Sequence, residues 1–197
     1  PSEGEDSAEQ RRTGEPGARG ISAFLVPADT PVLSFGANEK KMGWSAQPTR
    51  QVILDEVRVP ASSMLGVEGQ GFKIAMSALN GGRINIAACS IGGAQWALDR
   101  AVRYVQERFT FGEPLAEKQS VVFTLADMAT ELRAARALVR DAAAAVDAHS
   151  DDAALQCAMA KRYATDAAFT VANQALQLHG GYGYLSEYGI EKVVRDL

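Results

Sequence analysis

The sequence has few of the features that mark several large classes of protein. Only two cysteines and two histidines occur among its 197 residues, without a Cys/His cluster, so neither a disulfide framework nor a structural zinc site is supported. No apolar run approaches the roughly 20 residues of a membrane span, and the amino-terminal stretch has no signal-like apolar core. With 20 Lys and Arg against 24 Asp and Glu, no basic surface indicates nucleic acid.

The remaining composition is that of an ordinary folded chain. Hydrophobic residues make up 47% of the sequence, which is enough for a core. Cys89 and Cys157 both lie in helical patterns, so we expect two buried free thiols in a reducing compartment. The chain starts at Pro1 and stops at Leu197 inside a helical pattern, and we therefore expect it to be a fragment of a longer protein.

The first third of the chain has the pattern of short strands and turn residues that is typical of a β domain. Residues 1–20 are rich in glycine, proline and charge, which predicts a loop or a disordered lead-in. Three short β-branched runs bounded by Pro, Gly, Asn or Asp follow at 21–27, 32–35 and 49–60. Three strands cannot close a barrel, so we expect a partial β domain over residues 1–66. Trp44 lies in a loop, where a ring is more often a packing residue than the wall of a ligand site.

From residue 67 the hydrophobic period changes from about 2 to about 3.6, which predicts a helical domain over 67–197. The long helical patterns cover 70–108, 117–147 and 155–178. Short connections and alanine-rich faces favour an antiparallel bundle, with no strand between residues 85 and 170. A short fourth helix is expected after Ser186, an acceptable N-cap.

Two glycine pairs interrupt the first long helical pattern. Each glycine costs a helix about 1 kcal/mol relative to alanine, which the close approach of another helix or of a ligand usually offsets. Alanines flank Gly92–Gly93, which favours helix packing there. Polar Asn80 and Arg83 flank Gly81–Gly82, which favours a ligand.

The most specific stretch is QLHGGYGYLSEYGIEKVVRD, residues 177–196. Gly180 and Gly181 follow a helical pattern, as a C-cap does. Glycines at this place allow the backbone to approach a ligand and to present N–H groups to an anion. A Rossmann loop is excluded, because its glycines must follow a strand. The spacing alone favours a helix–turn–helix corner without a ligand.

This stretch resembles the C-terminal signature of the acyl-CoA dehydrogenases. The matching positions are Gln177, Gly180, Gly181, Gly183, Tyr184, Glu187, Lys192 and Asp196. Other family-like segments are KKMGWSAQPTR (40–50), VPASSMLGVEGQGF (59–72), RFTFGEPL (108–115) and LADMA (125–129). The resemblance implies the later strands of the family's middle β domain followed by its C-terminal helical bundle, truncated at Leu197.

The resemblance also implies an FAD site shared between the subunits of a homotetramer. Arg108, with Phe111, matches the family arginine that meets the FAD pyrophosphate across a subunit interface, and a planar cation suits that anion. Lys118 and Gln119 match positions next to the same cofactor. The segment over the adenosine side of FAD is matched by Gln177, Leu178, His179, Gly180 and Gly181. Without the family, a solvated arginine at a helix end explains Arg108 equally well.

The acyl-CoA thioester end is matched by Asn80, Gly81, Gly82 and Arg83. In the family a glutamate removes the α-proton while a hydride leaves the β-carbon for flavin N5. That glutamate lies a few residues beyond Arg195–Asp196 in most members, or just before the helix arginine, where this chain has Gly82. We therefore expect no catalytic residue in this chain, no activity from the chain alone, and surface positions for Glu187 and Glu191.

The function implied by the resemblance is FAD-dependent α,β-dehydrogenation of a short, branched acyl-CoA, with electrons passed to electron-transfer flavoprotein. It implies the cytoplasm of a bacterium or the mitochondrial matrix of a eukaryote, with no metal, nucleic acid or membrane partner. Two alternatives remain open. One is a flavin oxidase or monooxygenase on the same scaffold. The other is a non-catalytic helical oligomerisation module, since long alanine-rich helices need no active site.

Overall fold

The computed structural model describes residues 17–197, which divide into two compact units. One unit contains the described residues up to Glu39 together with Pro48–Leu79, and the other contains Lys40–Gln47 and Asn80–Leu197. The expected disordered lead-in lies mostly outside the described residues, and Gly17–Gly20 form a short 3₁₀ helix rather than a loop. The domain boundary expected after residue 66 stays a prediction.

The first unit contains two small antiparallel ladders. β1 (Ala23–Phe24) pairs with β4 (Met64–Leu65), and β2 (Leu33–Phe35) pairs with β3 (Val52–Leu54). Three of these strands fall inside the three runs predicted to be strands, and each is shorter than its run. All three residues of β3 are exposed, so this ladder encloses no core of its own. Strands that short require more of a sheet to be stable, as a partial β domain implies.

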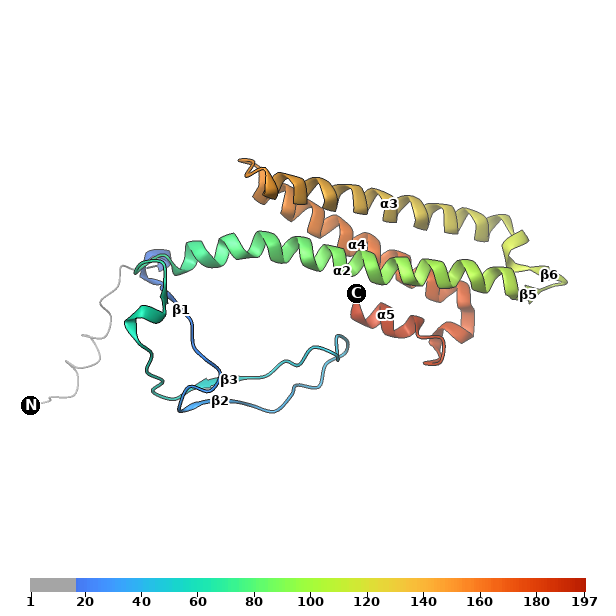
Figure 1. Cartoon of the computed structure of the whole chain (residues 1–197). Helices are drawn as coiled ribbons and strands as arrows, with labels where there is room; N and C mark the ends of the chain where they lie inside the picture. The colour runs from blue at the N-terminus through green and yellow to red at the C-terminus, as the bar shows by residue number, and fades with distance from the viewer. Residues whose placement is uncertain (1–16) are drawn as a thin grey trace, which may run out of the picture. The chain divides into compact units, whose positions relative to one another are not determined.

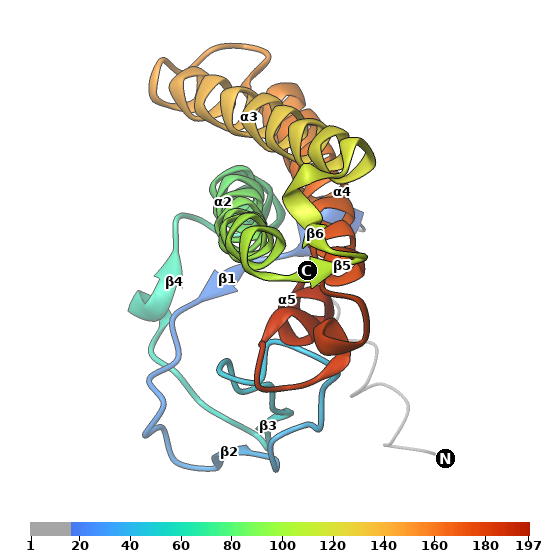
Figure 2. The ribbon, with the colours of Figure 1, turned by 90° about the vertical axis from the view of Figure 1, so that its right-hand side faces the viewer.

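The second unit is a helical bundle, which confirms the mostly α fold. Its long helices are α2 (Gly71–Glu107, in this unit from Asn80), α3 (Gln119–Asp147) and α4 (Ala153–His179). They run antiparallel in chain order, as Figure 1 shows from the side and Figure 2 along the bundle. Alanines fill much of the core and let the backbones approach closely; among them are Ala87, Ala94, Ala135, Ala164, Ala168 and Ala172. No described helix is both long and apolar enough to cross a membrane.

Two helical positions are more exposed than their apolar character suggests. In α3 the buried side chains include Val121 and Met128, whereas Val122 is 47% exposed. Both valines are apolar, and a shift of one residue turns a helix face by about 100°, so the sequence alone could not choose between them. Cys157 is buried as expected, but Cys89 is exposed. Cys89 lies on the side of α2 opposite the buried Ala87, which is why its helical pattern gave the wrong expectation.

The expectation of no strand between residues 85 and 170 is also wrong. After α2 the chain forms a hairpin of β5 (Phe109–Thr110) and β6 (Glu113–Pro114). Phe111 (φ 54°) and Gly112 (φ 89°) form its two-residue turn. Positive φ at both central residues matches the twist of the flanking strands, but only Gly112 adopts this conformation without strain. Of the two turn residues, only Gly112 therefore indicated a hairpin in the sequence.

The end of α4 is as predicted, and the start of the last helix is not. α4 ends at His179, and Gly180 caps it with φ 57°. The last helix, α5 (Ile190–Asp196), begins after Gly189 (φ 72°) rather than after Ser186. The carbonyl of Ser186 instead accepts a hydrogen bond from Gly189 N at 3.1 Å, which closes a turn. Ile190 is fully buried, so packing fixes where this helix starts.

Candidate functional site

A pocket of about 500 Å³ lies where the ends of α2 and α4 meet the β5–β6 hairpin. Its lining includes six of the nine residues predicted to bind the cofactor, namely Arg108, Gln177, Leu178, His179, Gly180 and Gly181. Five further lining residues were not predicted: Tyr104, Thr110, Leu115, Tyr182 and Leu185. The fold therefore brings together two motifs that are about seventy positions apart in the sequence.

Aromatic rings hold the two helix ends together. Tyr104 of α2 stacks on His179 of α4 with ring centroids 4.3 Å apart, and its hydroxyl donates to the His179 carbonyl at 3.3 Å. Tyr188 packs against both rings edge-on. His179 is 3% exposed, and its Nδ1 lies 2.7 Å from the carbonyl oxygen of Ala175, to which it donates. Burial lowers the pKa of His179 despite that hydrogen bond, and the charge of Arg100 lowers it further, so the ring is neutral at pH 7.

Arg108 is the only described cation that lines the pocket. Its guanidinium lies over the ring of Tyr182, 5.3 Å from the centroid. No described carboxylate lines the pocket or forms an ion pair with this side chain. Burial raises the pKa of Tyr104, while Arg108 acts in the opposite direction, as expected for a charge close to that ring. A cation without a carboxylate partner suits a pocket that receives an anion.

Thr110 supplies a second polar group that lacks a partner. Its Oγ1 is buried and forms no hydrogen bond, and Thr110 lines the pocket. Leaving such a group unpaired costs about 1–3 kcal/mol, which a ligand in the pocket can recover. Thr110 was missed although it lies inside the RFTFG motif. The available signal was strand alternation, which places Thr110 on the opposite face from the exposed Phe109.

The three glycines after α4 differ in what surrounds them. A Cβ at Gly180 or Gly181 meets nothing within 4 Å, so the pocket is open over both. A Cβ at Gly183 would lie 2.5 Å from the carbonyl oxygen of Leu176. The first pair therefore leaves room for a ligand, whereas Gly183 allows the chain to pack on the end of α4.

Phe111, Lys118 and Gln119 do not line the pocket. Phe111 is at the tip of the hairpin and is 99% exposed. The Nζ of Lys118 lies 5.7 Å from its ring centroid and forms a 2.7 Å ion pair with Glu113. Gln119 is the exposed first residue of α3. These three residues form a separate outer surface beside the pocket, and the positive φ of Phe111 is a backbone strain of the kind that clusters at functional sites.

The predicted substrate stretch lies far from this pocket. Arg83 and Tyr104 are on the same helix, about 30 Å apart at about 1.5 Å of rise per residue. Nη1 of Arg83 donates to Oδ1 of Asn80 at 2.8 Å, and a Cβ at Gly81 or Gly82 would meet nothing within 4 Å. In the second glycine pair, Gly93 lies against the side chain of Leu197, the residue that follows α5, whereas Gly92 faces open space. Whether residues 80–83 bind a ligand stays a prediction.

The pocket fits part of a phosphate-bearing cofactor. It combines an arginine without an acidic partner, a buried hydroxyl without a hydrogen bond and two open glycines, and no described carboxylate would repel an anion. Among residues 17–197 no group of three or more His, Cys, Asp or Glu residues is arranged to hold a metal ion.

Comparison with known proteins gives consistent matches over this region. The family model described as "Acyl-CoA dehydrogenase, C-terminal domain" matches residues 69–197. Mitochondrial isobutyryl-CoA dehydrogenase of Bos taurus is 53% identical over 185 residues, which are 94% of this chain and 44% of that protein. The corresponding protein of Dictyostelium discoideum is 54% identical over 94% of this chain and 45% of its own length.

The solved structures give the same result. Butyryl-CoA dehydrogenase from Megasphaera elsdenii superposes with a TM-score of 0.91 at 44% identity, over 94% of this chain and 48% of that one. The chain thus spans less than half the length of the relatives it matches. Because the family model covers more than half of the chain, and the fold agrees, the chain belongs to the acyl-CoA dehydrogenase family.

Proposed function

We propose that the full-length protein is an FAD-dependent dehydrogenase of a short, branched acyl-CoA. The observation that carries this proposal is the pocket in which Arg108, the unpaired Thr110 hydroxyl and the open Gly180–Gly181 backbone converge without a carboxylate. When bound, FAD supplies the hydride acceptor for α,β-dehydrogenation. The isobutyryl-CoA dehydrogenases at 53% and 54% identity support the branched substrate.

Each part of the pocket has a defined role in this proposal. Arg108 binds the pyrophosphate as a charge-assisted donor, and Thr110 donates a hydrogen bond to a cofactor oxygen. Gln177–Gly181 lie along the adenosine side, with neutral His179 held in one orientation by Ala175 and Tyr104. Phe111, Lys118 and Gln119 contact the same cofactor from the outer side of the hairpin. Asn80–Arg83 line the thioester end of the acyl-CoA.

We propose further that these FAD contacts are made across a subunit interface in a homotetramer. The fully exposed ring of Phe111 supports this, because it projects from a tight hairpin and packs on no described apolar side chain. In sedimentation experiments the full-length protein should then be a tetramer when FAD is bound. A stable FAD-bound monomer would contradict the proposal.

The proposed electron acceptor is electron-transfer flavoprotein. Relatives in the comparison include a subunit of the caffeyl-CoA reductase-Etf complex from Acetobacterium woodii, 44% identical over 91% of this chain. The mitochondrial isobutyryl-CoA dehydrogenases support a mitochondrial matrix location in a eukaryote, and a bacterial protein would be cytoplasmic. Residues 1–66 are proposed to form part of a middle β domain, and residues 67–197 are proposed to form most of the C-terminal helical domain.

An oxidase is the second candidate. The structures of the prolyl acyl carrier protein oxidase AnaB and of PigA with FAD and proline superpose with TM-scores of 0.85 and 0.86 at 29% and 27% identity. The same scaffold therefore occurs in a protein described as an oxidase. The non-catalytic oligomerisation module is less favoured, because it leaves the Thr110 hydroxyl without a partner.

The test uses full-length protein loaded with FAD under anaerobic conditions. We expect isobutyryl-CoA to bleach the flavin faster than butyryl-CoA, and electron-transfer flavoprotein to restore its colour. The reduced flavin should react slowly with oxygen while substrate is bound. Rapid reoxidation by oxygen would favour the oxidase, and the absence of bleaching with any acyl-CoA would contradict both enzymatic candidates. Residues 1–197 alone should show no turnover above a blank without enzyme.

A further inference from the structure

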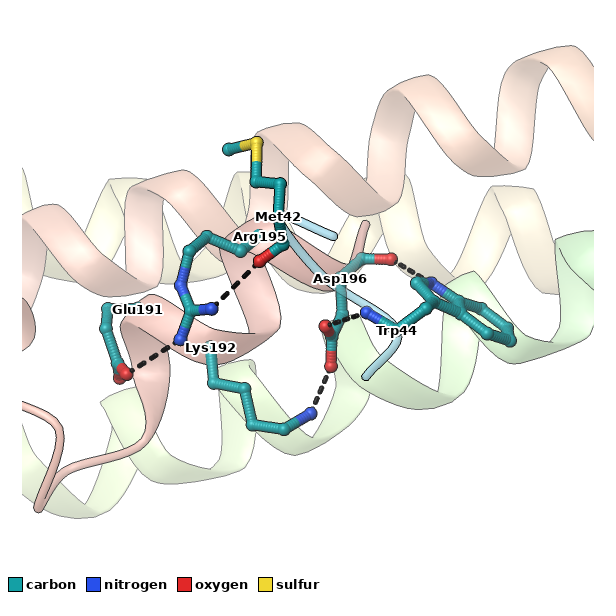
Figure 3. A network of polar contacts seen from close by, with 6 residues as sticks. All are labelled: Met42, Trp44, Glu191, Lys192, Arg195 and Asp196. Carbon is teal, nitrogen blue, oxygen red and sulfur yellow. Dashed lines mark hydrogen bonds and ion pairs between the residues drawn. The ribbon is translucent and has the colours of Figure 1, made fainter. Parts of the chain in front are cut away.

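The last turn of α5 is held by a segment more than 150 positions earlier in the chain. Two hydrogen bonds connect Trp44 to Asp196 (Figure 3). The Trp44 N–H donates to Oδ1 of Asp196 at 2.7 Å, and the indole Nε1–H donates to the Asp196 carbonyl. Arg195 adds a third, from Nη1 to the Met42 carbonyl at 3.0 Å. Lys40–Gln47 belong to the helical unit, although the residues on both sides of them belong to the other unit.

α5 requires such an anchor. It has only seven residues, and its N-cap, Gly189, provides no side-chain hydrogen bond. Helices shorter than about 12–15 residues are marginal without tertiary contacts. The fully buried Ile190 fixes the first residue of α5. The contacts with Met42 and Trp44 fix the other end.

Gly43 and Trp44 each have a backbone feature that suits this contact. A Cβ at Gly43 would overlap the carbonyl of Arg195, so only glycine allows the two backbones to approach this closely. Trp44 has φ 52°, a left-handed conformation that is rare for a large side chain. Holding it costs about 1–3 kcal/mol, which the two hydrogen bonds to Asp196 offset. Such strain persists only where the surroundings impose it, and it clusters at functional sites.

Asp196 remains charged in this arrangement. Burial alone would raise the pKa of its carboxyl, but hydrogen bonds from Lys192 and from the Trp44 N–H, with the charges of Lys192 and Arg195, outweigh burial and lower it. Arg195 is paired in turn with Glu191 at 3.2 Å. The acceptor for Trp44 is therefore an anion at neutral pH, which strengthens the hydrogen bond.

The anchored residues also form one wall of a cavity of about 560 Å³. Trp44, Asp196 and Leu197 lie on one side, and Ile86, Ser90 and Lys161 are among the lining residues of α2 and α4. Ile86 is one helical turn beyond Arg83, so this cavity adjoins the predicted substrate stretch. A displaced α5 end would change the cavity shape beside that stretch.

We infer that Trp44 and Asp196 are positioning residues, which fix the end of α5 in the place that acyl-CoA oxidation requires. This inference rests on the proposed function, in which acyl-CoA lies along residues 80–83, and on the family resemblance, which implies a base a few residues beyond Asp196. It differs from a purely structural role in one respect. Loosening the contact should slow flavin reduction while FAD retention and global stability change little.

The experiment compares full-length Asp196→Ala with Asp196→Asn, which keeps an oxygen able to accept from Trp44 N–H. Asp196→Ala should slow flavin reduction by acyl-CoA roughly tenfold to hundredfold, since small misplacements near reacting groups have effects of this size. Asp196→Asn should recover most of the rate. Hydrogen exchange of the α5 amides should quicken in Asp196→Ala and remain slow in α3. The matched control is Asp152→Ala, which removes an aspartate that accepts from Gln156 on α4.

A second variant keeps the inference testable if Asp196→Ala does not fold. Trp44→Phe removes the indole donor and leaves a smaller ring. Its control is Tyr163→Phe, which removes an aromatic O–H that donates from α4 to Glu131 of α3. Slower flavin reduction and faster exchange of the α5 amides should both appear in Trp44→Phe, more weakly than in Asp196→Ala, and neither should appear in the control. Faster α5 exchange with an unchanged reduction rate would overturn the inference by making the contact purely structural, and unchanged exchange would overturn it as well. If wild-type flavin is reduced by no acyl-CoA, the proposed function itself has failed, and the inference fails with it.

Discussion

The pocket at Arg108 and the stretch Asn80–Arg83 were both predicted to bind ligands, and the structure differs sharply between them. In the pocket, two helix ends and a hairpin converge and bring Arg108, Thr110 and two open glycines to one space. At Asn80–Arg83, a single helix carries one internal hydrogen bond between Arg83 and Asn80, and its glycines face open space. The first region is a pocket within the described residues, whereas at the second the described neighbours leave both glycines open.

The difference shows when the site that a sequence motif predicts can be recognised in the structure of this chain. A site formed where the ends of α2 and α4 meet is assembled by the same packing that forms the bundle core, so its geometry is present as soon as the bundle is. A site that uses one helix face depends on what covers that face.

The largest expected effect is on FAD binding. Arg108→Ala in the full-length protein should weaken FAD at least tenfold, since a charge-assisted contact contributes about 1.5–3 kcal/mol. The unfolding free energy of the apoprotein should fall by less than about 1 kcal/mol, because a helix-end cation contributes little to stability. Flavin fluorescence and the apoprotein melting temperature measure the two effects. Arg103→Ala, exposed on the same helix and outside the pocket, should change neither. Unchanged FAD affinity with a lower apoprotein melting temperature would make Arg108 a structural residue.

The second largest expected effect distinguishes two of the glycines that follow α4, Gly181 and Gly183. Gly183→Ala places a Cβ against the carbonyl of Leu176 and should lower stability by about 1–3 kcal/mol. Gly181→Ala, with open space around the new methyl, should leave stability almost unchanged and weaken FAD binding. Denaturant unfolding of the apoprotein and FAD titration separate the two. If Gly181→Ala keeps full FAD affinity, no ligand lies over that glycine.

The substrate stretch should respond in the opposite direction. Gly82→Ala lies inside a helix with no close neighbour, so it should stabilise the fold by up to about 1 kcal/mol. Gly92→Ala has the same helical setting and should give a similar gain. Only Gly82→Ala should raise KM for acyl-CoA, with FAD affinity intact in both. Equal KM values for the two variants would remove residues 80–83 from the substrate site.

The smallest expected effect is the pH response of His179. Because the pKa of His179 is lowered in the folded protein, the unfolded chain binds more protons as the pH falls below the ordinary value of 6.5. Its contribution to stability is thus complete above that value and is lost as the pH falls through the lowered pKa. Melting temperatures between about pH 7.5 and pH 5 should decline less steeply in His179→Gln than in wild type. His149→Gln is the matched substitution at the other histidine, and identical slopes in all three proteins would contradict the expectation.

Several features of the fold could be predicted because a local pattern determines them. Gly180 ends α4 in a left-handed conformation that glycine adopts freely, and the change of hydrophobic period marked the start of the helices. Ser186 was a plausible N-cap, yet the helix starts at Ile190, because burial of that side chain outweighs a cap whose worth is about 1 kcal/mol. The β5–β6 hairpin was missed because Phe111 gives no sign of its positive φ.

By itself the sequence determined the class of fold, the family resemblance and six of the residues that line the pocket at Arg108, because helical period, glycine caps and spaced motifs are local properties of the chain. Only the tertiary structure revealed the contribution of Thr110, whose significance lies in a buried hydroxyl without a partner. The contact between Trp44 and Asp196 likewise joins residues far apart in sequence. No local pattern encodes which donor meets which acceptor across such a distance, since packing of the whole bundle decides where each one lies.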